Sequence, residues 1–159
     1  MRLVFIGPFG LRPKRTMADR ALPLAQALAQ HGHTVRMILP PWNAPEDSGK
    51  TLTLGGVEVA HVKLPPRWPL LFHLLLTLRL LRAALNARAD VIHVFKPKAH
   101  AGFALFALWL MRGLRLTRVR LVADEDDWEG AGGWNEREAY PAFAKRLFAW
   151  QEAQSVKPV

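Results

Sequence analysis

Short runs of apolar residues alternate along this chain with longer stretches in which apolar positions recur every three or four residues. The short runs are nearly continuous in hydrophobic residues, which is typical of strands buried on both faces. These predicted strands lie at residues 2–7, 33–39, 90–95 and 118–123. The longer stretches have helical spacing and predict helices at about residues 16–30, 70–87, 98–112 and 136–154.

The alternation of strands and helices predicts an α/β fold: a Rossmann-like, doubly wound, mostly parallel sheet with helices on both faces. Two short β segments, 52–54 and 57–63, flank Gly55-Gly56 and predict a hairpin. In such a sheet the carboxyl ends of the strands at 2–7, 90–95 and 118–123 meet. We therefore expect the loops GPFGLRPKRT, FKPK and DEDDWEG to share one crevice.

The boundaries of the first helix carry three local signals. Thr16 is a candidate N-cap with Asp19 three residues later, Pro23 predicts a kink or a late start, and Gly32 after His31 predicts the C-terminal end. Together these signals favour a helix whose first turns differ from the rest.

The composition narrows the class of protein. A length of 159 residues suits one domain with a hydrophobic core. The absence of cysteine excludes a disulfide scaffold, a thiolate metal site and a cysteine nucleophile, and it fits a cytoplasmic location. The amino terminus is predicted to be a strand rather than a signal peptide. No apolar segment is predicted to span a membrane: charged residues and His73 interrupt 70–81, and 101–111 is too short.

Charge is distributed unevenly along the chain. Residues 1–123 carry 18 Lys and Arg against 5 Asp and Glu, whereas residues 124–159 carry 4 against 8. The net charge of +9 indicates an anionic partner. Arginines at 112–120 and in the helix at 70–87 suggest peripheral contact with an anionic membrane, although a solvated helix face explains them equally. Nucleic acid is not expected, because aromatic residues are not interleaved with the arginines.

The segment 7–16 links the first strand to the first helix. Glycines permit close approach of a backbone to a ligand, and a helix N-terminus attracts anions. The spacing matches neither G-x-G-x-x-G nor the P-loop pattern. The residues expected to bind phosphate are Gly7, Gly10, Lys14, Arg15 and Thr16. The alternative is an ordinary strand–helix loop with solvated cations.

Four consecutive acids, Asp124 to Asp127, end the last predicted strand, and burying such charge is costly unless it faces a cleft. Carboxylates here could hydrogen-bond sugar hydroxyls, with Trp128 stacked on a sugar ring. The pattern D-x-D could instead bind Mg²⁺ or Mn²⁺, and a solvated acidic loop is the third interpretation. The substrate-binding candidates are Glu125, Asp126, Asp127, Trp128 and Glu129, and no metal site is expected.

Three further candidates surround the strand at 90–95. His93 lies inside this strand, where a histidine is more often a core residue than a functional one, but its closeness to the strand end keeps it a candidate. Lys96 and Lys98 lie just beyond that end and could bind phosphate. The alternative for both lysines is a solvated loop.

Four segments together resemble the amino-terminal domain of family 4 glycosyltransferases, which are GT-B enzymes. They are RLVFIGPFG, KRTMADRALPLAQALAQHGHTVRMILPPWNAPEDSG, ADVIHVFKPKAHAG and LVADEDDWEGAGGWNE. The element L-A-x-x-L-x-x-x-G-H-x-V, from Leu24 to Val35, is widespread in that family. The resemblance runs from Met1 to about Glu152 and defines an expected domain at 1–152.

The resemblance implies two facing Rossmann-like domains, of which this one mainly holds the acceptor while the other holds a nucleotide-sugar. It implies transfer with retention and no cofactor beyond that co-substrate. Gly7 and Gly10 would approach the donor diphosphate. Asp126 and Asp127 occupy the position of a His-Asp pair in many relatives and would orient acceptor hydroxyls, with Trp128 packed on a ring.

Residues 153–159 are interpreted as a truncated tail, so the donor-binding domain is expected to be absent and the isolated chain inactive. The expected partners are a donor-binding domain or subunit and a glycan or lipid-linked acceptor, in cell-wall or lipopolysaccharide biosynthesis. A peripheral location at the inner membrane face follows. The alternative function is a non-catalytic domain that binds an anionic lipid headgroup or a partner subunit.

Overall fold

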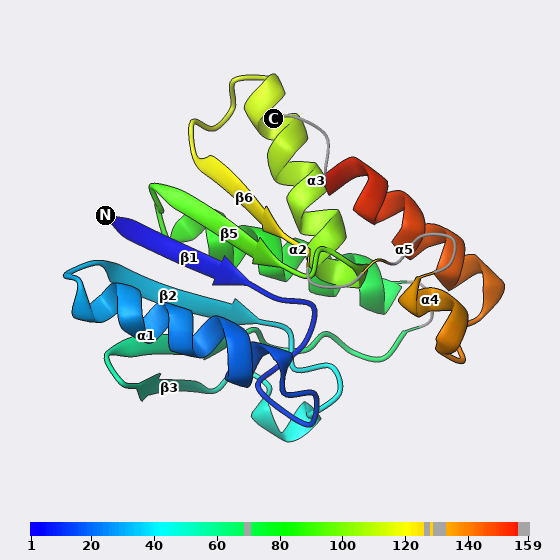
Figure 1. Cartoon of the computed structure of the whole chain (residues 1–159), viewed down its shortest axis with the longest axis horizontal. Helices are drawn as coiled ribbons and strands as arrows, with labels where there is room; N and C mark the ends of the chain where they lie inside the picture. The colour runs from blue at the N-terminus through cyan, green and yellow to red at the C-terminus, as the bar shows by residue number, and fades with distance from the viewer. Residues whose placement is uncertain (69–70, 126–127, 129–132, 156–159) are drawn as a thin grey trace.

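The parallel sheet that the apolar runs predict is present in the computed structural model, which describes residues 1–68, 71–125, 128 and 133–155. Within those residues a six-stranded sheet has the order β3-β4-β2-β1-β5-β6 (Figure 1). The strands are β1 (Arg2–Ile6), β2 (Thr34–Leu39), β3 (Thr51–Leu54), β4 (Val57–His61), β5 (Val91–Phe95) and β6 (Arg120–Asp124). Neighbouring strands are parallel except at the hairpin of β3 and β4.

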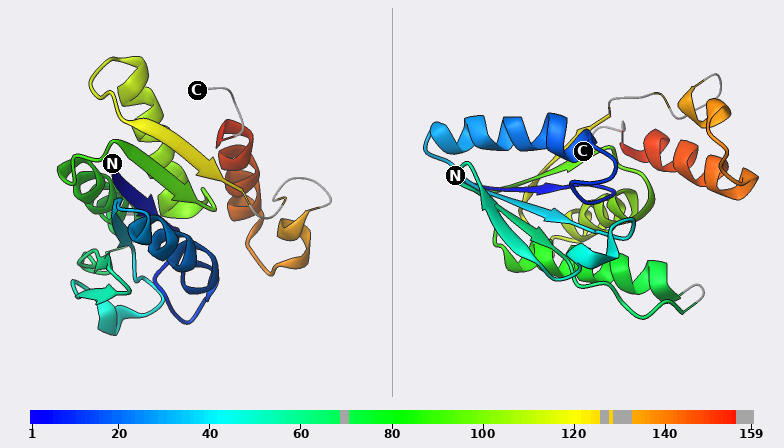
Figure 2. Two further views of the ribbon diagram at one scale, coloured as in Figure 1. Left: turned by 60° about the vertical axis from the view of Figure 1, so that its left-hand side comes forward. Right: turned by 90° about the horizontal axis from the view of Figure 1, so that it is seen from below.

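Helices cover both faces of this sheet. They are a π-helical turn η1 (Met17–Ala21), α1 (Leu22–Gln30), a 3₁₀ turn η2 (Pro45–Asp47), α2 (Leu71–Asn86), α3 (Ala99–Gly113), α4 (Trp134–Arg137) and α5 (Ala142–Ser155). Helix α1 lies on one face, and α2 and α3 lie on the other (Figure 2). Helix α5 packs beside α3. The predicted doubly wound α/β fold is confirmed.

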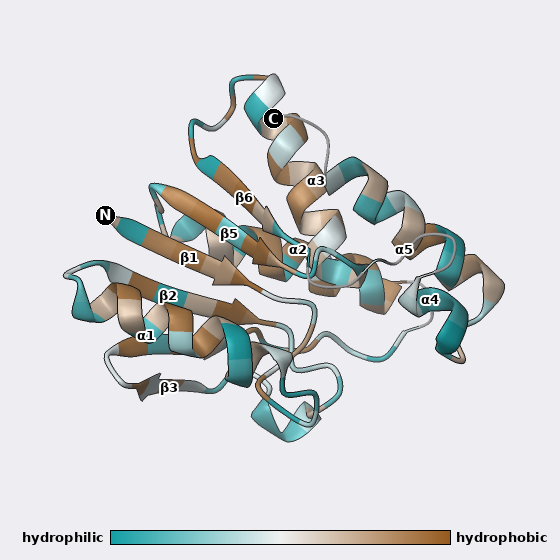
Figure 3. Ribbon diagram, viewed as in Figure 1, coloured by the Kyte–Doolittle hydropathy of each residue, from teal (hydrophilic) through white to brown (hydrophobic). Residues whose placement is uncertain are grey.

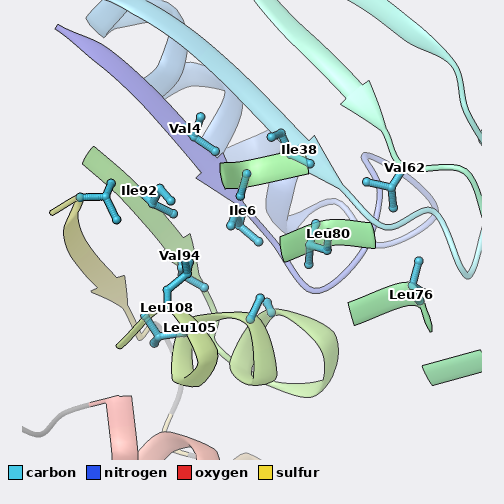
Figure 4. Packing of buried hydrophobic residues seen from close by; sticks show 14 residues of the cluster. Val4, Ile6, Ile38, Val62, Leu76, Leu80, Ile92, Val94, Leu105 and Leu108 are labelled. Atoms are coloured by element: carbon cyan, nitrogen blue, oxygen red, sulfur yellow. The ribbon is translucent and has the colours of Figure 1, made fainter. Parts of the chain in front are cut away.

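Two hydrophobic clusters hold the layers together, because successive strand residues face opposite sides. Val4 and Ile6 of β1 pack toward α2 and α3, where they meet Leu80 among other residues (Figure 4). Phe5, between them in the sequence, packs on the other face against Met17 of η1. Burial of each such side chain contributes about 1.5–3 kcal/mol to folding. In Figure 3 the strands β1 and β5 are mostly brown, whereas α1 and α5 mix brown and teal segments.

The first helix is only partly as predicted. Residues 17–21 form a π-helical turn, and α1 begins at Leu22 with Pro23 in its first turn, so the late start is confirmed. Thr16 has helical backbone angles and its side chain makes no capping hydrogen bond, so the predicted N-cap is wrong. The end is as predicted: Gly32 has a φ of +82°, and His33 N–H donates to the Leu28 carbonyl.

The single helix predicted at 136–154 is wrong. The chain forms two helices, α4 and α5, with Tyr140 and Pro141 between them. Proline has no N–H to donate and disfavours helical angles in the residue before it, so it interrupts a helix here and then helps start the next. The apolar spacing on either side of Pro141 concealed this break.

The strand order places a topological switch point between β1 and β5. Among the parallel strands, β2 and β4 follow β1 on one side of the sheet, whereas β5 and β6 lie on the other side. In open α/β sheets ligands bind beyond the carboxyl ends of the strands at such a point. Those ends face α4 and α5 in Figure 1. In the described part of the chain no helix is long and apolar enough to cross a bilayer.

Candidate functional site

A cleft of about 360 Å³ lies at the switch point, between the loops that follow β1 and β5. Its lining combines cationic and aromatic side chains with one carboxylate: Phe9, Lys14, Arg15, Thr16, Lys96, Lys98, Trp134, Glu138 and Tyr140. The predicted convergence of the GPFGLRPKRT and FKPK loops is therefore confirmed. We call this cavity the basic cleft.

Interactions outside the cleft anchor the loop after β1. Arg12 makes two hydrogen bonds of 2.9 Å to the carboxylate of Asp47, and it also pairs with Glu46 at 3.2 Å. The guanidinium of Arg12 lowers the pKa of Asp47 to about 2. Trp42 Nε1 donates to the Pro8 carbonyl at 2.7 Å. These contacts fix the loop against the β2–β3 connection, so Lys14 and Arg15 project from an anchored segment.

The two glycines of this loop do not line the basic cleft. A Cβ at Gly7 would overlap the buried side chain of Met17, so the Met17 side chain would have to shift to make room for it. A Cβ at Gly10 would lie 3.5 Å from Pro41 Cα, an ordinary contact. In this structure Gly7 therefore serves the packing of η1, and the phosphate-binding role predicted for both glycines stays a prediction.

The loop after β5 has an unusual backbone that several hydrogen bonds hold in place. Lys96 and Ala99 have φ values of +46° and +50°, which are unfavourable for residues with a side chain. Lys96 N–H donates to the Asp124 carbonyl at 2.7 Å. Gln151 of α5 exchanges two hydrogen bonds with the Ala99 backbone, at 2.8 and 3.0 Å. Strain of this kind is concentrated at functional sites, where the surroundings compensate for it.

Both lysines of this loop are buried side chains rather than members of a solvated loop. Lys96 is 8% exposed and Lys98 is 7% exposed. The Lys98 ammonium lies 5.6 Å from the ring centroids of both Tyr140 and Phe148. Cation–π attraction at this distance offsets part of the cost of burial. The solvated-loop alternative for Lys96 and Lys98 is therefore wrong.

Aromatic side chains from residues 134–140 complete the opposite wall. Trp134 Nε1 donates to Glu138 Oε1 at 2.9 Å, which orients the indole. Arg15 is engaged with Asp19 through hydrogen bonds as short as 2.7 Å. The sequence did not single out Trp134, Glu138 and Tyr140, because its apolar spacing predicts one continuous helix over most of this segment. The aromatic residues near Pro141 were the feature of the sequence that could have indicated a binding surface here.

Asp124 ends β6 beside the basic cleft without lining it. Arg20 Nη2 donates to Asp124 Oδ1 at 3.2 Å, and His93 Nε2 lies 3.7 Å from Asp124 Oδ2. The His93 ring stacks on Phe95 with centroids 4.2 Å apart. Burial lowers the pKa of His93, and the Asp124 carboxylate opposes this only in part. His93 is thus a neutral, mostly packed side chain with an acidic neighbour.

The remaining candidates of the acidic segment are only partly described. Ser155 Oγ donates to Glu125 Oε1 at 2.6 Å, so Glu125 faces α5 rather than the basic cleft. Trp128 is 61% exposed, and its carbonyl accepts a 2.6 Å hydrogen bond from Trp134 N–H. Asp126, Asp127 and Glu129 lie outside the described residues. Among the residues that are described, no cluster of three or more His, Asp and Glu could hold a metal ion.

Solved structures share this architecture at low sequence identity. Sucrose-phosphate synthase from Thermosynechococcus elongatus matches 99% of this chain with 13% identity and a TM-score of 0.66, and the chain spans 40% of that protein. A UGT transferase from Siraitia grosvenorii in complex with UDP matches 82% of this chain with 13% identity and a TM-score of 0.45. This chain spans 29% of the length of that protein. The first similarity supports the fold.

Sequence comparison identifies the family. No curated protein matches the chain. A family model described as glycosyl transferase 4-like domain matches residues 15–157, nearly the whole sequence. The matched region contains the cleft residues from Arg15 onward, including Lys96 and Lys98, whereas Phe9 and Lys14 precede it. The chain therefore belongs to the glycosyl transferase 4-like domain family.

Proposed function

We propose that this chain is the acceptor-binding domain of a glycosyltransferase that moves a sugar from a nucleotide-sugar to a glycan or lipid-linked acceptor. The observation that carries the proposal is the basic cleft, with Lys96 and Lys98 buried at the switch point of a glycosyltransferase-type sheet. Family membership supplies the reaction class. The cleft supplies cations for phosphate and aromatic faces for a sugar.

Each part of the basic cleft has a chemical task in such a transfer. The acceptor oxygen bonds to the anomeric carbon while the bond from that carbon to the diphosphate breaks, so negative charge grows on the leaving diphosphate. Lysine ammonium groups such as those of Lys14 and Lys96 stabilise that charge. Trp134 and Tyr140 offer apolar ring faces against which a sugar packs.

The proposal requires a second domain that holds the donor opposite this cleft. Transfer depends on aligning the acceptor oxygen with the anomeric carbon, and one wall of a cleft cannot fix both reactants. The partner is a donor-binding domain, on the same or another chain, and the nucleotide-sugar is the co-substrate. Asp126 and Asp127 remain the proposed contacts to acceptor hydroxyls, and no metal or further cofactor enters the proposal.

Reconstitution tests this function. The chain is mixed with a separately produced donor-binding domain of a glycosyltransferase, and transfer of a radiolabelled sugar from a nucleotide-sugar is measured. We expect no transfer by the chain alone and transfer by the mixture. Lys96→Gln should reduce transfer at least tenfold, whereas Lys63→Gln, at an exposed lysine outside the cleft, should not. Equal turnover with and without the added domain would contradict the proposal.

An exposed stripe on α2 favours the additional proposal of peripheral membrane contact. Leu71, Leu74 and Leu78 are 45%, 55% and 48% exposed, and their spacing of three to four residues places them on one face of α2. Trp68, which precedes the helix, is 58% exposed. Arg82 follows one turn after Leu78 and is exposed. Apolar side chains beside cations are typical of helices that lie on anionic lipid.

Vesicle co-sedimentation tests the stripe. The chain should bind vesicles containing phosphatidylglycerol and should be released as salt rises, because salt screens the attraction. Replacing Leu74 and Leu78 by serine should weaken binding, whereas Leu24→Ser, at an exposed leucine of α1, should leave it unchanged. Vesicle binding by a chain without any transfer in the reconstituted system would favour the non-catalytic alternative function.

A further inference from the structure

A second cavity, which no predicted site residue lines, lies where the first turns of α2, α3 and α5 meet. Its volume is about 380 Å³ and its surface is almost entirely apolar. The lining residues are Trp42, His73, Ala99, His100, Phe103, Phe143, Ala144, Leu147 and Phe148. We call it the aromatic pocket. An apolar cavity with few polar groups is the usual form of a small-molecule site.

The polar groups of the aromatic pocket are a pair of stacked imidazoles. His73 Nδ1 and His100 Nε2 are 3.1 Å apart, and the ring planes differ by 18°. His100 is 4% exposed, and burial lowers its pKa to about 4, so this side of the pocket carries no charge from His100 at neutral pH. His100 Nδ1 is buried and has no hydrogen-bond partner among the described residues. The pocket therefore suits an apolar group that carries a polar atom.

The aromatic pocket and the basic cleft share a wall. Tyr140 lines the cleft, Phe148 lines the pocket, and their rings are 5.4 Å apart. Lys98, which lines the cleft, lies 5.6 Å from the centroids of both rings. A ligand whose anionic group lies near Lys98 could therefore place an apolar group in the aromatic pocket, since only the rings of Tyr140 and Phe148 lie between them.

We propose that the aromatic pocket binds the apolar part of an acceptor whose phosphate group lies in the basic cleft, so that the acceptor is a phosphate ester of a hydrophobic alcohol. This inference rests on the proposed function and narrows its acceptor class. Burial of the apolar chain supplies affinity, and Lys98 fixes the phosphate beside Tyr140. The imidazoles of His73 and His100 are proposed to hydrogen-bond the ester oxygen that joins the hydrocarbon of the ligand to its phosphate.

Binding of two probes to the full chain tests the inference. Decyl phosphate, kept below its micelle concentration, and inorganic phosphate are titrated while amide chemical shifts are followed by NMR. We expect decyl phosphate to bind at least tenfold more tightly. Both probes should shift the amides of Lys96, Lys98 and Ala99, and only decyl phosphate should shift those of residues 143–148.

Variants separate the pocket from general surface binding. Phe143→Ser, at a residue that is 74% exposed and so tolerates change, should remove most of the gain for decyl phosphate and leave inorganic phosphate unchanged. Ala144→Trp, which fills the pocket, should do the same. Leu24→Ser, at an exposed leucine of α1 that lies outside the pocket, is the matched control.

The outcomes distinguish the two proposals. Equal affinity of the two probes, or equal loss in Phe143→Ser and Leu24→Ser, would overturn the inference and leave the basic cleft standing. Binding of decyl phosphate at the pocket with no response of residues 96–99 to either probe would overturn it together with the role of the cleft. Thermal unfolding of each variant establishes that it is folded.

Discussion

Gln151 on α5 and Ala99 at the start of α3 are joined by two hydrogen bonds, in which the Gln151 amide both accepts from and donates to the Ala99 backbone. This pairing holds a residue with a φ of +50° beside the lysines of the basic cleft. Gln151 is 3% exposed, so water cannot replace it.

Gln151→Ala should therefore be strongly destabilising. It removes the hydrogen-bond partner of the Ala99 N–H, in the first turn of α3, and one of the bonds to the Ala99 carbonyl, which costs about 1–3 kcal/mol. The measurement is the free energy of unfolding in urea, together with the affinity for inorganic phosphate, which should also fall as the loop loses its anchor. Gln30→Ala, at an exposed glutamine of α1, is the control and should change neither quantity.

Lys98→Gln should weaken the binding of phosphate to the basic cleft roughly tenfold, which corresponds to about 1.4 kcal/mol. The reason is the loss of an ammonium held against Tyr140 and Phe148. A phosphate titration by NMR at several salt concentrations measures this, and the variant should also show a weaker salt dependence. If Lys63→Gln weakened binding as much, the cleft would not be the site.

The free energy of unfolding should fall as pH is lowered from about 6.5 toward 4. His100 has a pKa lowered from 6.5 to about 4, so the unfolded chain takes up a proton that the folded chain resists, and its contribution reaches roughly 3 kcal/mol. His100→Phe should flatten this pH dependence, measured by urea unfolding at several pH values. It should not abolish it, since burial also lowers the pKa of His61 and His93.

A control for the pH experiment is Gln30→Ala, at an exposed glutamine of α1 that carries no ionisable group. Its pH dependence should equal that of the unchanged chain. A His100→Phe variant whose stability still falls as steeply between pH 6.5 and 4 would show that His100 is not the group responsible.

Gly7→Ala should destabilise the fold by about 1–3 kcal/mol, because the added methyl group overlaps the buried side chain of Met17. Gly113→Ala is the opposite case: a Cβ there meets nothing within 4 Å, and alanine favours the helix that ends at this residue. Thermal unfolding should show a lower midpoint for the first variant and an unchanged or higher one for the second.

Most of this fold could be predicted from the sequence, because the strands and the end of the first helix are each marked by neighbouring residues. The strands at 2–7, 33–39 and 90–95 were evident as apolar runs, and Gly32 marked the end of α1. Their parallel order followed from the alternation with helices, and this brought the loops after β1 and β5 together. Pro141 was the exception, because apolar spacing on both sides of it simulated a continuous helix.

The site was less accessible to the same reasoning. Lys96 and Lys98 could be placed at a strand end, but Lys98 is enclosed by Tyr140 and Phe148, which lie 42 and 50 residues later in the sequence. The pairing of His73 with His100 arises from the packing of α2 on α3, which no spacing along the chain encodes. Both the basic cleft and the aromatic pocket are formed by residues that are distant in the sequence and come together only in the folded chain.

The two ends of the parallel strands differ in how well they tolerate an insertion or an attached group. The basic cleft and the aromatic pocket lie beyond the carboxyl ends of the strands, whereas the turn at Gly32 and the exposed connection at 114–116 lie beyond the amino ends. Insertions are tolerated best at exposed connections of this kind. A fluorophore or an immobilising tag attached at Gly32 or at residues 114–116 would leave both cavities accessible to ligand in a binding measurement.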